Sequence, residues 1–312
     1  MTTIPKYAEL PLIPALRARH AWDVHGREDQ LGRVNLMTPA ATLAALSTVR
    51  TGEVFNLCLP LNQPDLSWAG RKKFSHHVFC PDRNTQDDYL DGFYLQGSTQ
   101  WDSLRHIKAR EFGFYGGRQD AEAGPHGREL GIDHWARHGI VGRGVLADVY
   151  GFCERRGQRI AAHEDFTITV PLLREVLADA KVELASGDIL LLRTGFVDAY
   201  LAGQPELHTG EPLAASPGLE GSEEMAEFLW DSGVAAIAAD NPAVEVMPGD
   251  PSVGLLHRRL IPLLGFALGE FFDLAALARH CAEDAHYTGL FMSAPLHLPG
   301  GVGSPANALF IK

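Results

Sequence analysis

Short, uninterrupted apolar segments alternate with helical segments along this chain, and this alternation constrains its fold more than any other feature. The segments 189–195 (ILLLRTG) and 234–240 (VAAIAAD) are short and show no polar alternation, which is typical of strands buried on both faces. We predict strands at 54–61, 139–149, 189–195, 234–240 and 265–270, and helices at 40–50, 170–180, 222–232, 253–264 and 274–284. Strands that alternate with helices favour an α/β fold with a buried, mixed sheet.

The chain shows no internal repeat and no low-complexity linker. We therefore predict one structural unit over residues 51–312, preceded by an N-terminal arm at 1–50. Thr38 and Thr169 each precede a predicted helix and suit the N-cap position, where a hydroxyl accepts a hydrogen bond from the first turn. Residues 62–95 are polar and irregular in pattern, and we interpret them as a long loop, a feature that is usually functional or disordered. We expect the segment 300–305 (GGVGSP) to form a tight turn.

Composition excludes several classes of partner. The net charge is −12, which argues against nucleic acid because phosphate binding relies on basic patches. No apolar run approaches the ~20 residues that span a bilayer, and the first residues lack the apolar core of a signal peptide. The four cysteines form no CxxC pair, so we expect free thiols and a cytoplasmic location.

Eleven residues at 96–106 (QGSTQWDSLRH) gather amide, carboxylate and imidazole side chains around a Gly-Ser-Thr turn. Gln100 and Asp102 have the period-two spacing that places side chains on one face of an extended strand. Asp102 and His106 are four residues apart, so they share a face if a helix starts near Asp102. The segment therefore predicts a strand, a turn and a helix that aim several side chains at one point.

A second set of ligand-type residues lies far downstream. His257 falls on the predicted helix 253–264, and Glu270 ends the predicted strand 265–270. Together with Asp102 they would form a site with two carboxylates and one imidazole, which suits zinc, manganese or ferrous iron. A divalent ion there lowers the pKa of bound water to about 7, and a nearby His106 could then shuttle the proton.

Other residues are weaker candidates for contact with a substrate. They are Trp101, His76, His77 and Asp240, with Arg105, Arg143 and Arg193 as candidates to hold a substrate carboxylate. Each has a structural alternative: a histidine pair in a loop is commonly solvated, an Asp after a strand can form an Asx turn, and an arginine can pair with a structural carboxylate. We expect Trp101 and the loop 62–95 to shape a pocket that accepts aromatic groups.

Taken in order, these segments resemble the metal-dependent cyclase and bacterial kynurenine formamidase superfamily, which includes isatin hydrolase. The family motif H-x-G-T-H-x-D-x-P-x-H aligns with residues 96–106, where Asp102 and His106 match in place and spacing. The segment LLHRRLIPLLGFALGEFFDL matches the later His-helix-Gly-x-x-x-x-Glu segment and supplies His257 and Glu270. Further matches are DILLLRTGF, the ending PLHLPGGVGSPANALFI and WDVHGREDQLGRVNLMTP, the last typical of the longer branch called cyclase family proteins.

The resemblance implies a swivelling β/β/α fold, a homo-oligomer (dimer or tetramer) and one or two divalent ions, manganese or zinc, per subunit. It implies hydrolysis of a C–N bond in a small amide, formamide or lactam by metal-activated water. Carried over by position, Asp102, His257 and Glu270 would bind metal, and His106 would transfer the proton.

The sequence departs from the family at Gln96 and Gln100, where the relatives have histidines, and at Leu104, where they have proline. A glutamine carbonyl is a neutral oxygen donor, so a manganese or magnesium ion loses less affinity here than zinc. Three outcomes stay open. One metal sits on Asp102, His257 and Glu270 alone; the glutamine carbonyls help to bind a hard ion; or the glutamines bind substrate amides.

We therefore predict a metal-dependent hydrolase of a small molecule, with kynurenine formamidase activity itself less expected because two motif histidines are absent. The first alternative is a metal-dependent cyclase, lyase or dehydratase, in which the same base removes a proton instead of activating water for attack. The second is a catalytically inactive relative that binds a small molecule.

Overall fold

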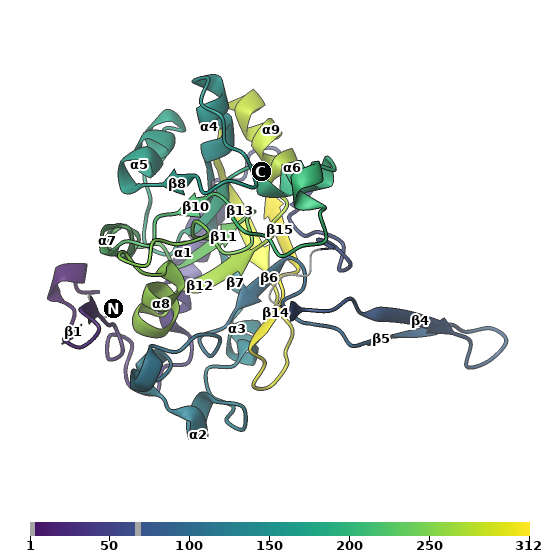
Figure 1. Ribbon diagram of the computed structural model, residues 1–312, viewed down its shortest axis with the longest axis horizontal. Helices are drawn as coiled ribbons and strands as arrows, with labels where there is room; N and C mark the ends of the chain where they lie inside the picture. The colour runs from purple at the N-terminus through teal and green to yellow at the C-terminus, as the bar shows by residue number, and fades with distance from the viewer. Residues whose placement is uncertain (1–3, 66–69) are drawn as a thin grey trace.

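A large mixed sheet forms the centre of the protein (Figure 1). The computed structural model describes residues 4–65 and 70–312. Within these residues the sheet has the strand order β14-β6-β12-β11-β9-β7-β13-β15-β3. Its strands are β3 (Val54–Asn56), β6 (Gln100–Asp102), β7 (Ile140–Asp148), β9 (Ile189–Arg193), β11 (Ala236–Ala239), β12 (Ala267–Glu270), β13 (Thr288–Ser293), β14 (Gly303–Pro305) and β15 (Ala308–Ile311).

The four central strands β12, β11, β9 and β7 run parallel, and antiparallel strands flank them on both sides. All four residues of β11 and the first four of β9 are buried, as expected for strands covered on both faces. The predicted α/β fold with a buried mixed sheet is confirmed, and the strands predicted at 139–149, 189–195, 234–240 and 265–270 lie within it.

Helices connect and cover the strands of this sheet. They are α1 (Pro39–Leu46), α2 (Asp120–Ala123), α3 (Ile132–His138), α4 (Val149–Arg155), α5 (Val170–Asp179), α6 (Phe196–Leu201), α7 (Glu223–Asp231), α8 (Leu256–Arg259) and α9 (Ala275–Asp284). The Thr38 hydroxyl accepts from Ala41 N at 3.2 Å and the Thr169 hydroxyl from Leu172 N at 3.5 Å, so both predicted caps are confirmed. No helix in the described ranges is long and apolar enough to cross a membrane.

Four local expectations were wrong. Residues 62–95 contain a hairpin of β4 (Ser75–Phe79) and β5 (Asp87–Asp91) that projects from the body, with all ten strand residues exposed (Figure 1). The strand predicted at 54–61 is shortened to β3 and an isolated bridge between Cys58 and Phe272, and the expected turn at 300–305 includes strand β14. The helix predicted at 253–264 is α8 followed by a π-helical turn, η7 (Leu260–Leu264), because Pro262 cannot donate to the α-helical ladder.

The first fifty residues pack closely on the body. They hold η1 (Tyr7–Glu9), β1 (Leu12–Ile13), β2 (Ala18–Arg19) and η2 (Gly32–Leu36). The fully buried Arg33 guanidinium lies 4.3 Å from the Trp230 ring centroid and 4.7 Å from that of Phe266, and it donates to Val234 O. The Trp22 indole donates to Pro262 O at 2.7 Å. The arm is thus anchored in the core, and a domain boundary at residue 50 stays a prediction.

Candidate metal centre

Two neighbouring antiparallel strands carry most of the site. In the register of β6 and β12, Gln100 lies opposite Glu270 and Asp102 opposite Leu268. Gln100 and Asp102 therefore share one face of β6, as their spacing predicted, and Trp101 points to the other face. The third ligand-type residue, His257, comes from α8, which packs beside α7.

Asp102, His257 and Glu270 converge on one point. One ligand atom from each of the three lies within 4.8 Å of the others. His257 Nε2 is 3.7 Å from Asp102 Oδ2 and 3.4 Å from Glu270 Oε1. The three residues are 1%, 9% and 5% exposed, respectively. The fold thus brings together the two carboxylates and the imidazole that the sequence analysis grouped.

His106 also reaches the site, but not by the predicted helix. The strand β6 ends at Asp102 and a turn follows, so the expectation of a helix starting there was wrong. The turn still brings His106 Nε2 to 3.7 Å from Asp102 Oδ2. The His106 side chain is 24% exposed, which leaves the imidazole open to solvent while its edge faces the buried carboxylate.

The two glutamines bind the carboxylates directly. Gln96 Nε2 donates to Asp102 Oδ1, and Gln100 Nε2 donates to Glu270 Oε2. Gln96 Nε2 also lies 3.2 Å from His106 Nδ1. An amide that donates to a carboxylate orients it and leaves its other oxygen available. This is an arrangement that the three sequence-based outcomes did not include.

Glu245 is the site residue that sequence reasoning missed. It is 4% exposed, and its Oε1 lies 3.0 Å from His257 Nδ1. Its other carboxylate oxygen accepts from the backbone N–H of Leu256 at the start of α8. Such a partner fixes the ring and directs Nε2 to the site. The signal available in the sequence was a lone carboxylate inside the apolar run AVEVM, because an unpaired charge is rarely buried.

The electrostatics of the pocket are dominated by its buried carboxylates. Burial, reinforced by the charge of Asp102, raises the pKa of Glu270. Burial would also raise the pKa of Asp102, but His106, His257 and the Gln96 hydrogen bond hold it below its ordinary value. Burial disfavours protonated His257, yet hydrogen bonds to Asp102, Glu245 and Glu270 raise its pKa well above the usual range. The pocket therefore favours a positive charge between the two carboxylates.

This donor set fits a divalent cation. Two carboxylates and one neutral imidazole nitrogen are ligands for zinc, manganese or ferrous iron. Gln100 Oε1 is buried and has no hydrogen-bond partner in the described structure, although buried polar atoms are nearly always satisfied. An unpartnered oxygen beside Glu270 is therefore a second indication, independent of the ligand triad, that the site takes a cation or a polar ligand.

Trp101 and Asp240 do not join the site. Trp101 is fully buried, its indole donates to Ser293 Oγ at 2.9 Å, and it packs edge-on against Phe272. Its predicted contact with substrate is therefore corrected: it belongs to the core on the opposite face of β6. Asp240 accepts from Thr194 N at 2.7 Å and is 1% exposed, so it shapes the turn after β9 instead of a pocket wall.

The three candidate arginines have structural partners. Arg105 donates to the backbone oxygens of Gly300, Gly124 and Gly127. Arg143 pairs with Asp188, and Arg193 bridges Asp148 and Asp198. Each of these arginines therefore has a structural role, the alternative that we gave to binding a substrate carboxylate.

His76 and His77 lie on the projecting hairpin. His76 Nε2 pairs with Asp88 at 2.7 Å, and the His77 ring stacks on Tyr89. His76 lines a cavity of about 1300 Å³ between the hairpin and the segment 61–65, together with Phe93, Tyr94 and Gly97. Gly97 adjoins Gln96 in the chain, and Arg71, another lining residue, donates to Gln96 O at 2.5 Å, so the cavity wall reaches the segment that carries Gln96. The cavity lining includes Phe93 and Tyr94, in line with the expectation that residues 62–95 shape a pocket that accepts aromatic groups.

A family model and a solved structure indicate the same family for this chain. The family model described as "Putative cyclase" matches residues 55–246. A crystal structure described as a novel cyclase is 32% identical, covers 94% of this chain and 99% of its own, and superposes with a TM-score of 0.82. No curated protein sequence matches.

Isatin hydrolases share the fold. One, bound to the product analogue thioisatinate, is 16% identical over 88% of this chain and 95% of its own, with a TM-score of 0.59. Isatin hydrolase A from Ralstonia solanacearum is 16% identical over 87% of this chain and 94% of its own, with a TM-score of 0.60. At this identity the likeness concerns the fold alone.

Proposed function

This chain belongs to the cyclase family, and from that premise we propose that it is a metal-dependent hydrolase that cleaves the C–N bond of a small amide, formamide or lactam. The convergence of Asp102, His257 and Glu270 within 4.8 Å carries the proposal. The lactam is included because structures that share this fold are named isatin hydrolases, and isatin is a cyclic amide.

We propose one ion for each subunit, either manganese or zinc. The relatives' two additional histidines are Gln96 and Gln100 here, and both amides donate to the ligand carboxylates. With those nitrogens engaged, the set Asp102, His257 and Glu270 supplies three protein ligands, the number found in catalytic sites that keep a position open for water. When bound, such an ion lowers the pKa of a water molecule and polarises a carbonyl.

His106 is the residue that we assign to proton transfer. Its Nδ1 lies 3.2 Å from the Gln96 amide nitrogen, so Gln96 helps to orient the imidazole. In amide hydrolysis water adds to the carbonyl carbon, the C–N bond breaks, and the departing nitrogen takes a proton. His106, at the solvent-accessible edge of the site, can take the proton that the adding water loses and then, as imidazolium, give a proton to that nitrogen.

The cavity beside the hairpin suits a substrate with an aromatic ring. Phe74, Phe93 and Tyr94 line it, and Arg71 on the same wall donates to Gln96 O at 2.5 Å. We propose that the acyl or lactam group lies near Asp102 and that the ring occupies this cavity. A homo-oligomer also remains a proposal, supported by the exposed apolar side chains of the hairpin, among them Val78 and Tyr89.

Metal content tests the proposal directly. We expect elemental analysis of purified protein to find about one equivalent of manganese or zinc, and Asp102→Ala to lose it while retaining the far-ultraviolet circular dichroism of the wild type. Asp88→Ala, the same change at an exposed hairpin carboxylate, is the control and should keep the metal. Metal retained in Asp102→Ala would show that the site assignment is wrong.

Isotopic labelling separates hydrolysis from the cyclase or lyase alternative, which the family description keeps in view. Small formamides, anilides and lactams are screened with the manganese- and zinc-loaded protein in oxygen-18 water. Hydrolysis places one labelled oxygen in the product acid, whereas a lyase or dehydratase product carries no label from bulk water in its carboxyl group.

A further inference from the structure

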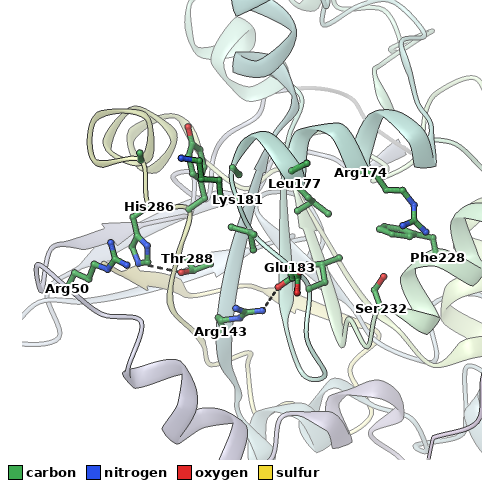
Figure 2. A pocket seen from close by; sticks show the side chains of 16 residues that line it. Arg50, Arg143, Arg174, Leu177, Lys181, Glu183, Phe228, Ser232, His286 and Thr288 are labelled. Atoms are coloured by element: carbon green, nitrogen blue, oxygen red, sulfur yellow. Dashed lines mark hydrogen bonds between the residues drawn. The ribbon is translucent and has the colours of Figure 1, made fainter.

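A second cavity, of about 1000 Å³, lies at the opposite end of the parallel strands from the metal centre. Its walls are α5, α7, the chain before β13 and the first part of β7 (Figure 2). Gly144, Ile189, Ala236 and Ala267 lie side by side across the sheet. Arg143 precedes this row and Glu270 follows it, three strands away, or about 14 Å across the sheet alone. The cavity is therefore separate from the metal centre.

Positive charge gathers around this cavity although the chain as a whole carries a net charge of −12. Arg50, Arg174 and Lys181 line it, and Glu183 is the one carboxylate among its lining residues. None of these three cations forms an ion pair within the described part of the chain. Uncompensated cations that surround a cavity attract anions.

The surrounding structure holds several of these groups in place. Arg143 forms two hydrogen bonds with Asp188, at 2.8 and 2.6 Å, so its charge is neutralised. A third bond, to Glu183 O, holds it in the cavity wall (Figure 2). The Arg174 guanidinium lies 4.7 Å from the Phe228 ring centroid. This contact orients the guanidinium without consuming its hydrogen-bond donors.

Lys181 occupies a backbone conformation that glycine normally takes. It follows the end of α5 with φ of 54°, and Val182 N donates to Leu177 O in the manner of a Schellman cap. The left-handed conformation is unfavourable for a side chain with a Cβ atom. A lysine held there brings an ammonium group to the cavity wall at a position where the backbone alone favours glycine.

Apolar groups complete the wall between the cations. Leu177, Val182 and Leu184 line the cavity beside the Phe228 ring. His286 adds no charge at neutral pH, since burial lowers its pKa and its Nε2 donates to Thr48 O at 3.0 Å. We propose that this cavity binds a small organic anion in which a phosphate or carboxylate group adjoins an apolar body.

Calorimetric titration tests this proposal with three probes: phenyl phosphate, benzoate and inorganic phosphate. The protein is used as purified, in buffer free of phosphate and carboxylates, so that no buffer anion competes with the probes. We expect saturable binding of phenyl phosphate or benzoate, tighter than that of inorganic phosphate, and the comparison of the first two tells which acid group is preferred. No saturable binding of any probe, or equal binding of phosphate and phenyl phosphate, would overturn the proposal.

Three variants locate the binding site. Arg174→Gln and Lys181→Gly should each weaken binding about tenfold, the usual effect of losing one charge-assisted hydrogen bond. Lys181→Gly should not lower the unfolding temperature, because glycine relieves the backbone conformation, so lost binding there cannot come from misfolding. Arg83→Gln, the same charge change at an exposed hairpin residue outside both cavities, is the control and should bind as the wild type does.

Two results would refute the location. Affinities unchanged in Arg174→Gln and Lys181→Gly would place the anion elsewhere. A change in oligomeric mass of these variants by light scattering would show that the cavity is an interface between copies of the chain. Neither result depends on the hydrolase proposal, because the titration measures binding and not turnover, and the variants lie outside the metal centre.

Discussion

Glu245 holds His257 in place, and replacing it with glutamine tests whether the metal centre depends on that contact. The Glu245 carboxylate accepts from His257 Nδ1 at 3.0 Å and from the backbone N–H of Leu256. Helix α8 has no side chain of its own at the N-cap, so Glu245 also fills that role. Glutamine keeps the shape of the side chain but removes the charge and turns one acceptor into a donor.

The expected magnitude follows from these contacts. A hydrogen bond to a charged group contributes about 1.5–3 kcal/mol, and a buried donor left without a partner costs about as much. Loss of a partner that orients a metal-bound histidine typically weakens metal binding 10- to 100-fold, or about 1.4–2.7 kcal/mol. The two estimates agree, so Glu245→Gln should lower metal affinity 10- to 100-fold and destabilise the metal-free protein by about 2 kcal/mol.

The assay is competition for zinc or manganese against a chromogenic chelator, with urea unfolding of the metal-free protein measured in parallel. Glu129→Gln is a control at a glutamate that pairs with Arg118 and, in the described structure, makes no hydrogen bond with the site residues, and it should leave metal affinity unchanged. If Glu245→Gln binds metal as tightly as the wild type while His257→Ala does not, Glu245 does not orient the ligand and the reasoning fails.

Three further predictions follow from other contacts. Gln100→Glu should destabilise the metal-free protein at neutral pH and lower its urea midpoint, because a carboxylate replaces the amide that donates to Glu270. A urea midpoint at or above that of the wild type would contradict this. Burial, with the charge of Asp198, raises the pKa of Asp240 from 3.8 to about 7. The protonated Asp240 carboxyl therefore stabilises the fold fully below about pH 4, and this stabilisation is lost as the pH rises to 7. Asp240→Asn should flatten the pH dependence of urea unfolding over that range, and an unchanged slope would count against it. Replacing residues 75–91 with a short glycine-rich turn should leave the unfolding temperature unchanged, since those strand residues are all exposed, and should lower the oligomeric mass by light scattering; an unchanged mass would rule the hairpin out as an interface.

Local patterns were sufficient for much of the fold. Continuous apolar runs identified β9 and β11, and the hydroxyls of Thr38 and Thr169 marked the starts of α1 and α5. These features succeed because burial on both faces and helix capping depend on neighbouring residues. The hairpin at 75–91 was missed because its side chains are exposed, so no buried face imposes an alternating pattern on them.

The sequence by itself determined which chemical groups are available to the site. It supplied Asp102, His257 and Glu270 as ligand types, His106 at a useful spacing, and amides at Gln96 and Gln100. It also determined, through spacing, that Gln100 and Asp102 share a face of β6, whereas the placement of Trp101 in the core came from the structure.

Only the tertiary structure decided how those groups meet. Gln100 and Glu270 are 170 positions apart and become neighbours through the register of β6 and β12, which no local pattern encodes. The same packing turns both amide nitrogens toward carboxylates and brings Glu245 behind His257. The physical reason is that secondary structure follows from short-range propensity and burial, whereas the direction of a side chain in a site depends on contacts between distant segments.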